Sequence, residues 1–142
     1  MEKWVAFALV SMIFAGFTSV IAKMGLVGIS GELGITIRTL FVSLFVLGFA
    51  AIAVPMNDYS LLSRTNILWL GLSALTTTLS WIFYYKALKL GDVATVALID
   101  KGSVVVAILL AWLLLKEVIT LRILIGGALI VGGLLVMVKR HN

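Results

Sequence analysis

Five continuous apolar stretches, each about 20 residues long, constrain this chain more than any other feature of its sequence. They cover residues 4–22, 33–54, 67–87, 93–115 and 121–138. A helix needs about 20 apolar residues to cross the hydrocarbon core of a bilayer. Backbone groups in hydrocarbon must be paired within the segment, and continuous hydrophobicity lacks the alternation of a barrel strand. The sequence therefore predicts an all-α membrane protein with five transmembrane helices in one domain, residues 1–142.

The composition excludes a soluble alternative. Of the 142 residues, 63% are hydrophobic and 12% are charged, whereas soluble domains have about 45–50% and about 25%. A soluble fold of this length leaves too much of its surface exposed to hide so many apolar side chains. We expect a multi-pass protein of the cell (inner) membrane. The first apolar stretch is longer than the core of a signal peptide, about 7–15 residues, so we expect it to be retained.

The residue types that most enzymes need are nearly absent. The chain has no cysteine, and its single histidine is His141. Thiol chemistry, disulfides and thiolate metal sites are therefore excluded, and no HExxH or GxSxG motif occurs. Basic residues do not cluster with aromatic residues as in nucleic-acid-binding proteins. The sequence predicts no enzyme activity, no cofactor, no metal site and no nucleic-acid partner.

Turn and capping residues separate the apolar stretches. Pro55, the only proline, ends the second stretch. Asp92 follows Gly91 and is placed to cap the fourth helix, and Thr120 is placed to cap the fifth. Gly28, Gly31 and Gly34 are expected to loosen the first loop. Connections this short predict that consecutive helices are antiparallel neighbours.

Positive charges give almost no preference for one orientation in the membrane. One predicted surface carries four positive charges, Lys3, Arg64, Lys116 and Arg122. The other carries five, Lys23, Lys86, Lys89, Lys139 and Arg140, or six if Arg38 reaches back to it. The excess of Lys and Arg that normally keeps one surface in the cytoplasm is therefore nearly missing. Two readings follow: a single orientation retained in spite of the small difference, or insertion in both orientations with two copies paired head-to-tail.

Two adjacent charges lie inside the fourth apolar stretch. Asp100 and Lys101 are 7–8 residues beyond its start at Val93, or about 11 Å at 1.5 Å per residue. A charge near the bilayer centre costs about 2.5–3.5 kcal/mol, so it usually marks a functional site. Asp100 could carry a proton through a transport cycle, and Lys101 could attract a substrate. The structural alternative is an ion pair that only stabilises the fold or a dimer.

The third apolar stretch carries hydroxyl and aromatic residues on one helical face. Trp81 and Tyr85 are separated by one helical turn, and Thr77 lies one turn earlier. We expect these three side chains to line a substrate or proton pathway together with the charged pair. Tyr84 near the helix end is assigned to an aromatic belt. Arg38 in the second stretch is treated as an anchor that reaches back to the membrane surface.

Small residues recur at helical spacing in the last two stretches. We expect them to form close helix contacts, within the subunit or between two copies, because small side chains let membrane helices approach each other. These residues are Ser103, Ala107, Ala111, Gly126 and Gly133.

The segment from Ala87 to Val136 resembles a known repeat. It has a short Ala-Leu-x-x-Gly turn, a Glu before a Thr turn and a glycine-rich last helix, here Ala87, Leu88, Gly91, Glu117, Thr120, Gly126, Gly127, Gly132 and Gly133. Together with Leu98-Ile99-Asp100-Lys101, it is similar to the EamA-type domain of the drug/metabolite transporter superfamily, in its small five-helix form. That family often has a proline in the middle of the fourth helix, and this sequence has none around Gly102–Val104. A broken fourth helix is therefore not carried over from the resemblance, and the sequence leaves open whether that helix is broken.

The resemblance implies an activity and an assembly. Larger members of the family join two such repeats in inverted orientation, which gives ten helices. A single repeat therefore implies a homodimer, antiparallel in the membrane, that transports small organic metabolites or drugs as a secondary transporter, with or without proton coupling. The alternative is a structural or accessory membrane subunit that transports nothing itself. Nothing in the sequence identifies the substrate, the direction of transport or the coupling ion.

Overall fold

The computed structural model describes residues 2–138, and within that range its regular structure is entirely helical. These residues form two compact units that divide between Leu90 and Gly91. Lys139, Arg140 and His141 lie outside the described residues. The all-α class predicted from the apolar stretches is therefore confirmed.

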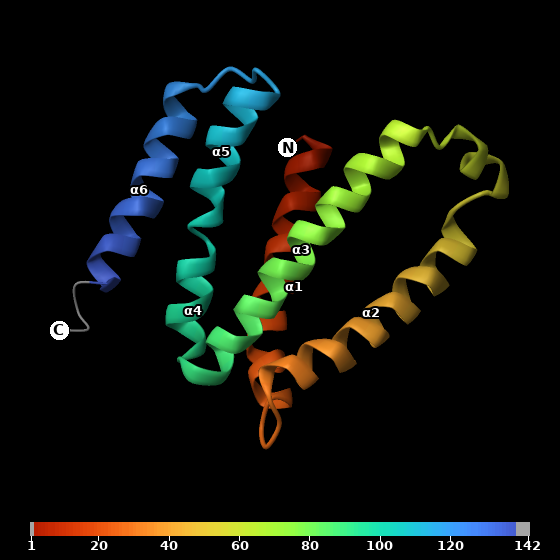
Figure 1. The fold of residues 1–142 in the computed structure, drawn as a ribbon. Helices are drawn as coiled ribbons and strands as arrows, with labels where there is room; N and C mark the ends of the chain where they lie inside the picture. The colour runs from red at the N-terminus through yellow and green to blue at the C-terminus, as the bar shows by residue number, and fades with distance from the viewer. Residues whose placement is uncertain (1, 139–142) are drawn as a thin grey trace. The chain divides into compact units, whose positions relative to one another are not determined.

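Three long helices make up the first unit (Figure 1). They are α1 (Lys3–Gly25), α2 (Gly31–Ala53) and α3 (Arg64–Leu90), with a short 3₁₀ helix, η1 (Met56–Leu61), between the last two. α2 begins where Ser30 caps it, because the Ser30 hydroxyl accepts a hydrogen bond of 3.1 Å from the Leu33 N–H. It ends before Pro55, whose ring cannot continue a helix.

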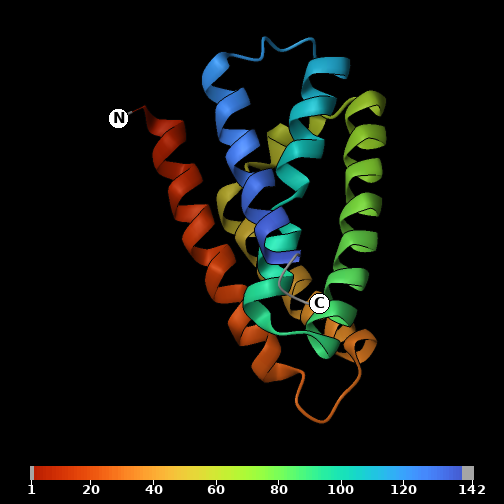
Figure 2. The same cartoon turned by 90° about the vertical axis from the view of Figure 1, so that its left-hand side faces the viewer.

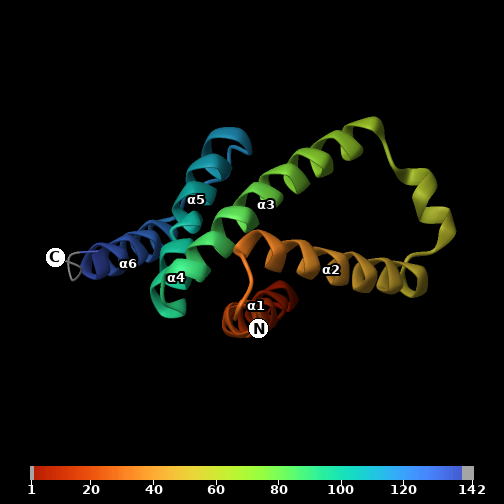
Figure 3. The ribbon, with the colours of Figure 1, turned by 60° about the horizontal axis from the view of Figure 1, so that its bottom comes forward.

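The three helices of the first unit meet at one end and separate toward the other (Figures 1 and 3). They meet where α1 and α3 finish and α2 begins. The Lys89 ammonium donates a 3.0 Å hydrogen bond to the carbonyl of Leu26, which caps α1. In return, Lys23 donates to the carbonyl of Leu88. Each lysine thus supplies a donor and a positive charge to the C-terminal end of the other helix, where both are favourable.

Two glycines allow α2 to start close to its neighbours. A Cβ atom on Gly31 would lie 2.9 Å from the backbone oxygen of Tyr85, and one on Gly34 would overlap the side chain of Leu26. A larger residue at position 31 would push against the backbone of α3 and require the helices to shift, whereas one at position 34 would require the Leu26 side chain to move. Glycines that the sequence assigned to a loose loop therefore hold a tight contact between helices.

The second unit contains three shorter helices (Figure 2). They are α4 (Val93–Asp100), α5 (Ser103–Leu114) and α6 (Leu121–Val138). Asp92 caps α4 as predicted, since its carboxylate accepts a 2.8 Å hydrogen bond from the Thr95 N–H. Thr120 caps α6 through a longer bond of 3.4 Å from the Ile123 N–H.

The range expected to be one helix, 93–115, is interrupted at Lys101 and Gly102. Hydrogen bonds there span three residues instead of four: the Gly102 N–H donates to Ile99 at 2.9 Å and the Val104 N–H to Lys101 at 3.1 Å. This is the tighter 3₁₀ pattern, which inside a helix often marks a hinge. A Cβ on Gly102 would lie 3.0 Å from the Ile99 oxygen and 3.1 Å from Leu134 of α6. A glycine in close contact with a neighbouring helix, and not a proline, occupies the break.

Four of the apolar segments are long enough to cross a membrane. These are the three helices of the first unit and the α4–α5 segment Val93–Leu114, while Leu121–Met137 is a shorter apolar helix. Most large apolar side chains on all of them are exposed, such as Phe14 at 68% and Phe45 at 68%. Exposure of this extent is expected where lipid, or a second protein surface, covers the helices.

Candidate functional site

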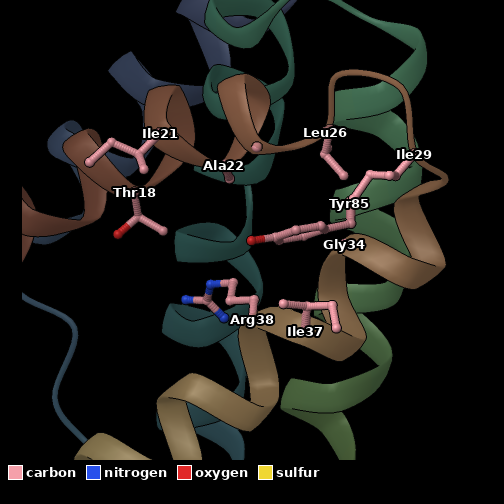
Figure 4. Close-up of a pocket in the computed structure, with 10 residues that line it drawn as sticks. Thr18, Ile21, Ala22, Leu26, Ile29, Gly34, Ile37, Arg38 and Tyr85 are labelled. Carbon is pink, nitrogen blue, oxygen red and sulfur yellow. The ribbon is translucent and has the colours of Figure 1, made fainter.

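A pocket of about 390 Å³ lies at the end of the first unit where its three helices meet. Side chains from α1, the α1–α2 turn, α2 and α3 form its wall (Figure 4). The lining residues are Thr18, Ile21, Ala22, Gly25, Leu26, Ile29, Gly34, Ile37, Arg38 and Tyr85. This volume is within the range of about 300–1,000 Å³ that small-molecule sites occupy. The wall is mostly apolar, with few polar groups.

Arg38 provides the positive charge in this wall. It lies seven residues after Gly31, the first residue of α2, which is about 10 Å along the helix. Its side chain is partly buried, and its Nη1 atom is buried without a hydrogen-bond partner in the described part of the chain. Neither the Lys86–Glu32 pair, at 3.2 Å, nor the Lys101–Asp100 pair includes it. Such an unpaired buried donor is unusual in a folded protein.

Two aromatic rings hold the guanidinium of Arg38. Its Cζ atom lies 4.2 Å from the centre of the Trp81 ring and 6.0 Å from that of Tyr85. Both distances are within the range of cation–π attraction, about 6 Å. In Figure 4 the side chains of Arg38 and Tyr85 extend from α2 and α3 into the space bordered by α1.

The structure brings together two of the three residues that the sequence placed on one face of the third helix. Tyr85 is 4% exposed and lines the pocket. Trp81 is not among the lining residues, but its ring contacts the guanidinium of Arg38, which is. Thr77 is not among the lining residues, and its hydroxyl donates to the Ser73 carbonyl of its own helix at 2.8 Å. Tyr84, assigned to an aromatic belt, donates a 2.7 Å hydrogen bond to Ser19 of α1.

Asp100 and Lys101 lie in the second unit, at the break between α4 and α5. Their charged groups are 3.7 Å apart, and their side chains are 38% and 56% exposed respectively. The second unit by itself therefore leaves this ion pair partly uncovered. In residues 2–138 no group of three or more His, Cys, Asp or Glu side chains is placed to hold a metal ion.

The small residues of α5 and α6 divide into two sets. Gly127 packs within the unit, since a Cβ there would lie 3.4 Å from Ile108 of α5. Gly126 and Gly133 have no neighbouring atom within 4 Å of the Cβ position in the described chain. Ser103 and Ala107 are exposed, and Ala111 is partly buried. The close contact between α5 and α6 therefore uses Gly127 and leaves Gly126 and Gly133 open.

Arg38 is the site residue that the sequence reasoning missed. It was assigned to the membrane surface because a long side chain can reach back from a buried position. Its depth of about 10 Å in its helix is nearly the same as the depth that singled out Asp100. The cost of a charge at this depth therefore marks Arg38 as a candidate site residue as well.

Comparison with known proteins adds a family to this geometry. The EamA-like transporter family matches residues 2–139. The chain is also similar to a Sinorhizobium sp protein named "Uncharacterized transporter in cobO 3'region", with 35% identity over 136 residues and 96% of each chain covered. No solved structure gives a significant match.

Proposed function

The chain belongs to the EamA-like transporter family and is a membrane transporter; on that basis we propose that it moves small organic molecules as a secondary transporter and works as an antiparallel homodimer. The pocket beside Arg38 is the observation that carries this proposal. It combines an apolar wall with one charged group, which is the usual arrangement of a site for a small organic molecule.

The homodimer is supported by surfaces that one subunit leaves uncovered. Gly126 and Gly133 are open on α6, and the Asp100–Lys101 pair is partly exposed. Small residues let membrane helices approach closely, and a charged pair in the membrane needs polar partners or water around it. A second copy packed on these helices would supply a close neighbour for the open glycines and polar partners for the charged pair. The nearly balanced positive charges on the two surfaces agree with opposite orientations of the two copies.

Asp100 is the residue that we assign to proton coupling. It is the last residue of α4, beside the break, and Lys101 next to it supplies the opposite charge. Acidic residues within membrane helices commonly form proton relays in transporters. If Asp100 took up a proton, its ion pair with Lys101 would be lost. Lys101 would then present an uncompensated positive charge to a substrate.

Transport is tested by counterflow in proteoliposomes. Purified protein is reconstituted with unlabelled benzoate, alanine or tetraphenylphosphonium inside, and uptake of the same labelled compound is measured. These probes represent anionic, zwitterionic and cationic molecules. Accumulation of at least one above protein-free liposomes is expected. Accumulation of none would favour the accessory role.

The orientation of the subunits can be tested without first removing cysteines, because the chain has none. A single cysteine at Ser60, an exposed residue of η1, is labelled in intact cells with a membrane-impermeant maleimide. Insertion in both orientations predicts labelling of about half of the protein, with the rest labelled after the membrane is opened. Labelling of all or none of the protein before opening would contradict the antiparallel dimer.

A further inference from the structure

We propose that the pocket of the first unit binds the carboxylate of a small organic anion, with Arg38 as the anchoring residue. This inference rests on the proposed transport function, because it names the class of substrate for the same protein. The group that Arg38 would recognise is an oxyanion. Such a group can come from a carboxylic acid in solution or from the phosphate of a lipid headgroup, and the experiment below separates the two.

The first argument is the unpaired donor. A guanidinium carries five N–H donors and always keeps its charge. Nη1 of Arg38 is buried without a partner, and leaving a buried donor unpaired is unfavourable. Among the described residues that line the pocket, none is an Asp or a Glu. The protein thus supplies a positive charge inside a pocket and no negative charge on its wall to neutralise it.

The second argument is the way in which the guanidinium is held. Trp81 and Tyr85 contact it through their rings, at 4.2 Å and 6.0 Å from the ring centres. A cation–π contact supplies no oxygen acceptor, so it leaves the guanidinium donors without a carboxylate or carbonyl partner. A carboxylate pairs with the edge of a guanidinium through two parallel hydrogen bonds. The aromatic residues therefore orient Arg38 without occupying the donors that a ligand would need.

The third argument is the rest of the wall. Ile21, Leu26 and Ile37 line the pocket with Arg38 and would contact the apolar part of a ligand. The hydroxyl of Thr18 donates to the Phe14 carbonyl of its own helix at 2.9 Å. A compact molecule with one carboxylate and an apolar body, such as an aromatic acid, matches this combination.

Binding is tested with benzoate and with benzamide, which has the same ring but no charge. Thermal unfolding of the purified protein in detergent is measured over a range of concentrations of each compound. We expect benzoate to raise the unfolding temperature and benzamide not to do so. In Arg38→Gln the dissociation constant for benzoate should rise about 10- to 100-fold, as for the loss of a charged hydrogen-bonded pair. Arg122→Gln, the same change in α6, should bind benzoate like the original protein.

A second variant covers the case in which Arg38→Gln does not fold. Arg38→Lys keeps the charge but loses the planar fork, so it should bind benzoate more weakly than the original protein while still binding it better than benzamide. Equal affinity for benzoate and benzamide in the original protein would overturn the proposal. So would unchanged benzoate affinity in either Arg38 variant.

The lipid source is tested by adding phosphatidylglycerol to the micelles. If lipid phosphate is the natural occupant, this lipid will raise the unfolding temperature through Arg38 and prevent the effect of benzoate, which would overturn a carboxylate substrate. Counterflow separates this inference from the proposed function. Accumulation of alanine or tetraphenylphosphonium with no benzoate binding would leave transport intact and refute the anion site. Benzoate binding without any counterflow would leave the site intact and refute transport.

Discussion

The two units of this chain differ in the polar contacts that join their helices. In the first unit, residues on different helices bond to one another: Tyr84 to Ser19, Lys89 to Leu26 and Lys23 to Leu88. The buried side chains also lie there, Leu88 among them with no exposed surface. In the second unit α4 and α5 bury no residue. The ion pair there joins Asp100 and Lys101, which are adjacent in sequence and not on different helices of a packed bundle.

This difference separates a pocket that the first unit encloses by itself from a charged pair that the second unit leaves partly exposed. The pocket at Arg38 has walls from three helices of the same unit. The charged pair at Asp100 has no comparable enclosure within its own unit. Ligand binding at the first should therefore survive when subunits are separated, while any role of the second should depend on assembly. The following variants test this comparison.

The largest effect is expected for transport at Asp100. Asp100→Asn removes the negative charge and leaves Lys101 unpaired in the membrane, where an uncompensated charge costs about 2.5–3.5 kcal/mol. Uptake of whichever probe is transported, driven by an imposed pH gradient, should fall below about one tenth of the rate of the original protein, while the amount of protein in the membrane stays unchanged. Asp58→Asn, in the exposed η1 segment, is the control. Normal uptake under the pH gradient in Asp100→Asn would show that the pair is structural.

A large effect on stability is expected for Gly31. Gly31→Ala places a methyl group against the Tyr85 carbonyl, 2.9 Å away, and should destabilise the protein by about 1–3 kcal/mol. Gly132→Ala in α6 meets no atom within 4 Å and should stabilise it by about 0.5–1 kcal/mol, because alanine favours a helix more than glycine does. Thermal unfolding in detergent measures both. Equal changes in unfolding temperature for the two variants would show that the two glycines are packed equally closely against their neighbours.

A smaller loss is expected at the contact between α1 and α3. Tyr84→Phe removes the hydroxyl that donates to Ser19 at 2.7 Å and should cost about 0.5–1.5 kcal/mol. Tyr59→Phe makes the same change at a residue that is 48% exposed, and its unfolding temperature should not change. If Tyr84→Phe also has no effect, the α1–α3 contact depends on apolar packing alone.

The smallest difference is expected between the helix caps. Ser30→Ala removes a 3.1 Å capping bond and should destabilise by about 1 kcal/mol. Thr120→Ala removes a bond of 3.4 Å, which is long for a hydrogen bond, and should cost less. The free energy of unfolding of each variant is compared with that of the original protein. A greater loss of unfolding free energy for Thr120→Ala than for Ser30→Ala would show that the cap in the second unit contributes more to stability than the cap in the first.

Local features of this fold were predictable from sequence. Asp92 and Thr120 were expected to cap helices, and both do so, because a cap depends only on a residue and the backbone three positions later. The shared face of Trp81 and Tyr85 follows from helical spacing in the same way.

Features that depend on contacts between distant residues were not predictable. The direction of the Arg38 side chain depends on where α3 lies, which the sequence of α2 does not contain. The break at Gly102 lies against Leu134, 32 positions later. The proline that often marks such a break is absent, so no local pattern indicates this contact.

The interruption at Lys101 and Gly102 also has a chemical consequence. A bend made by proline is permanent, because the imino ring has no amide proton and collides with the preceding turn. Every residue from Ile99 to Val105 retains its N–H. This segment can therefore exchange its bonding partners and straighten without any covalent obstacle. Since an alternating-access cycle needs two conformations of nearly equal energy, a joint of this kind suits it better than a rigid corner would.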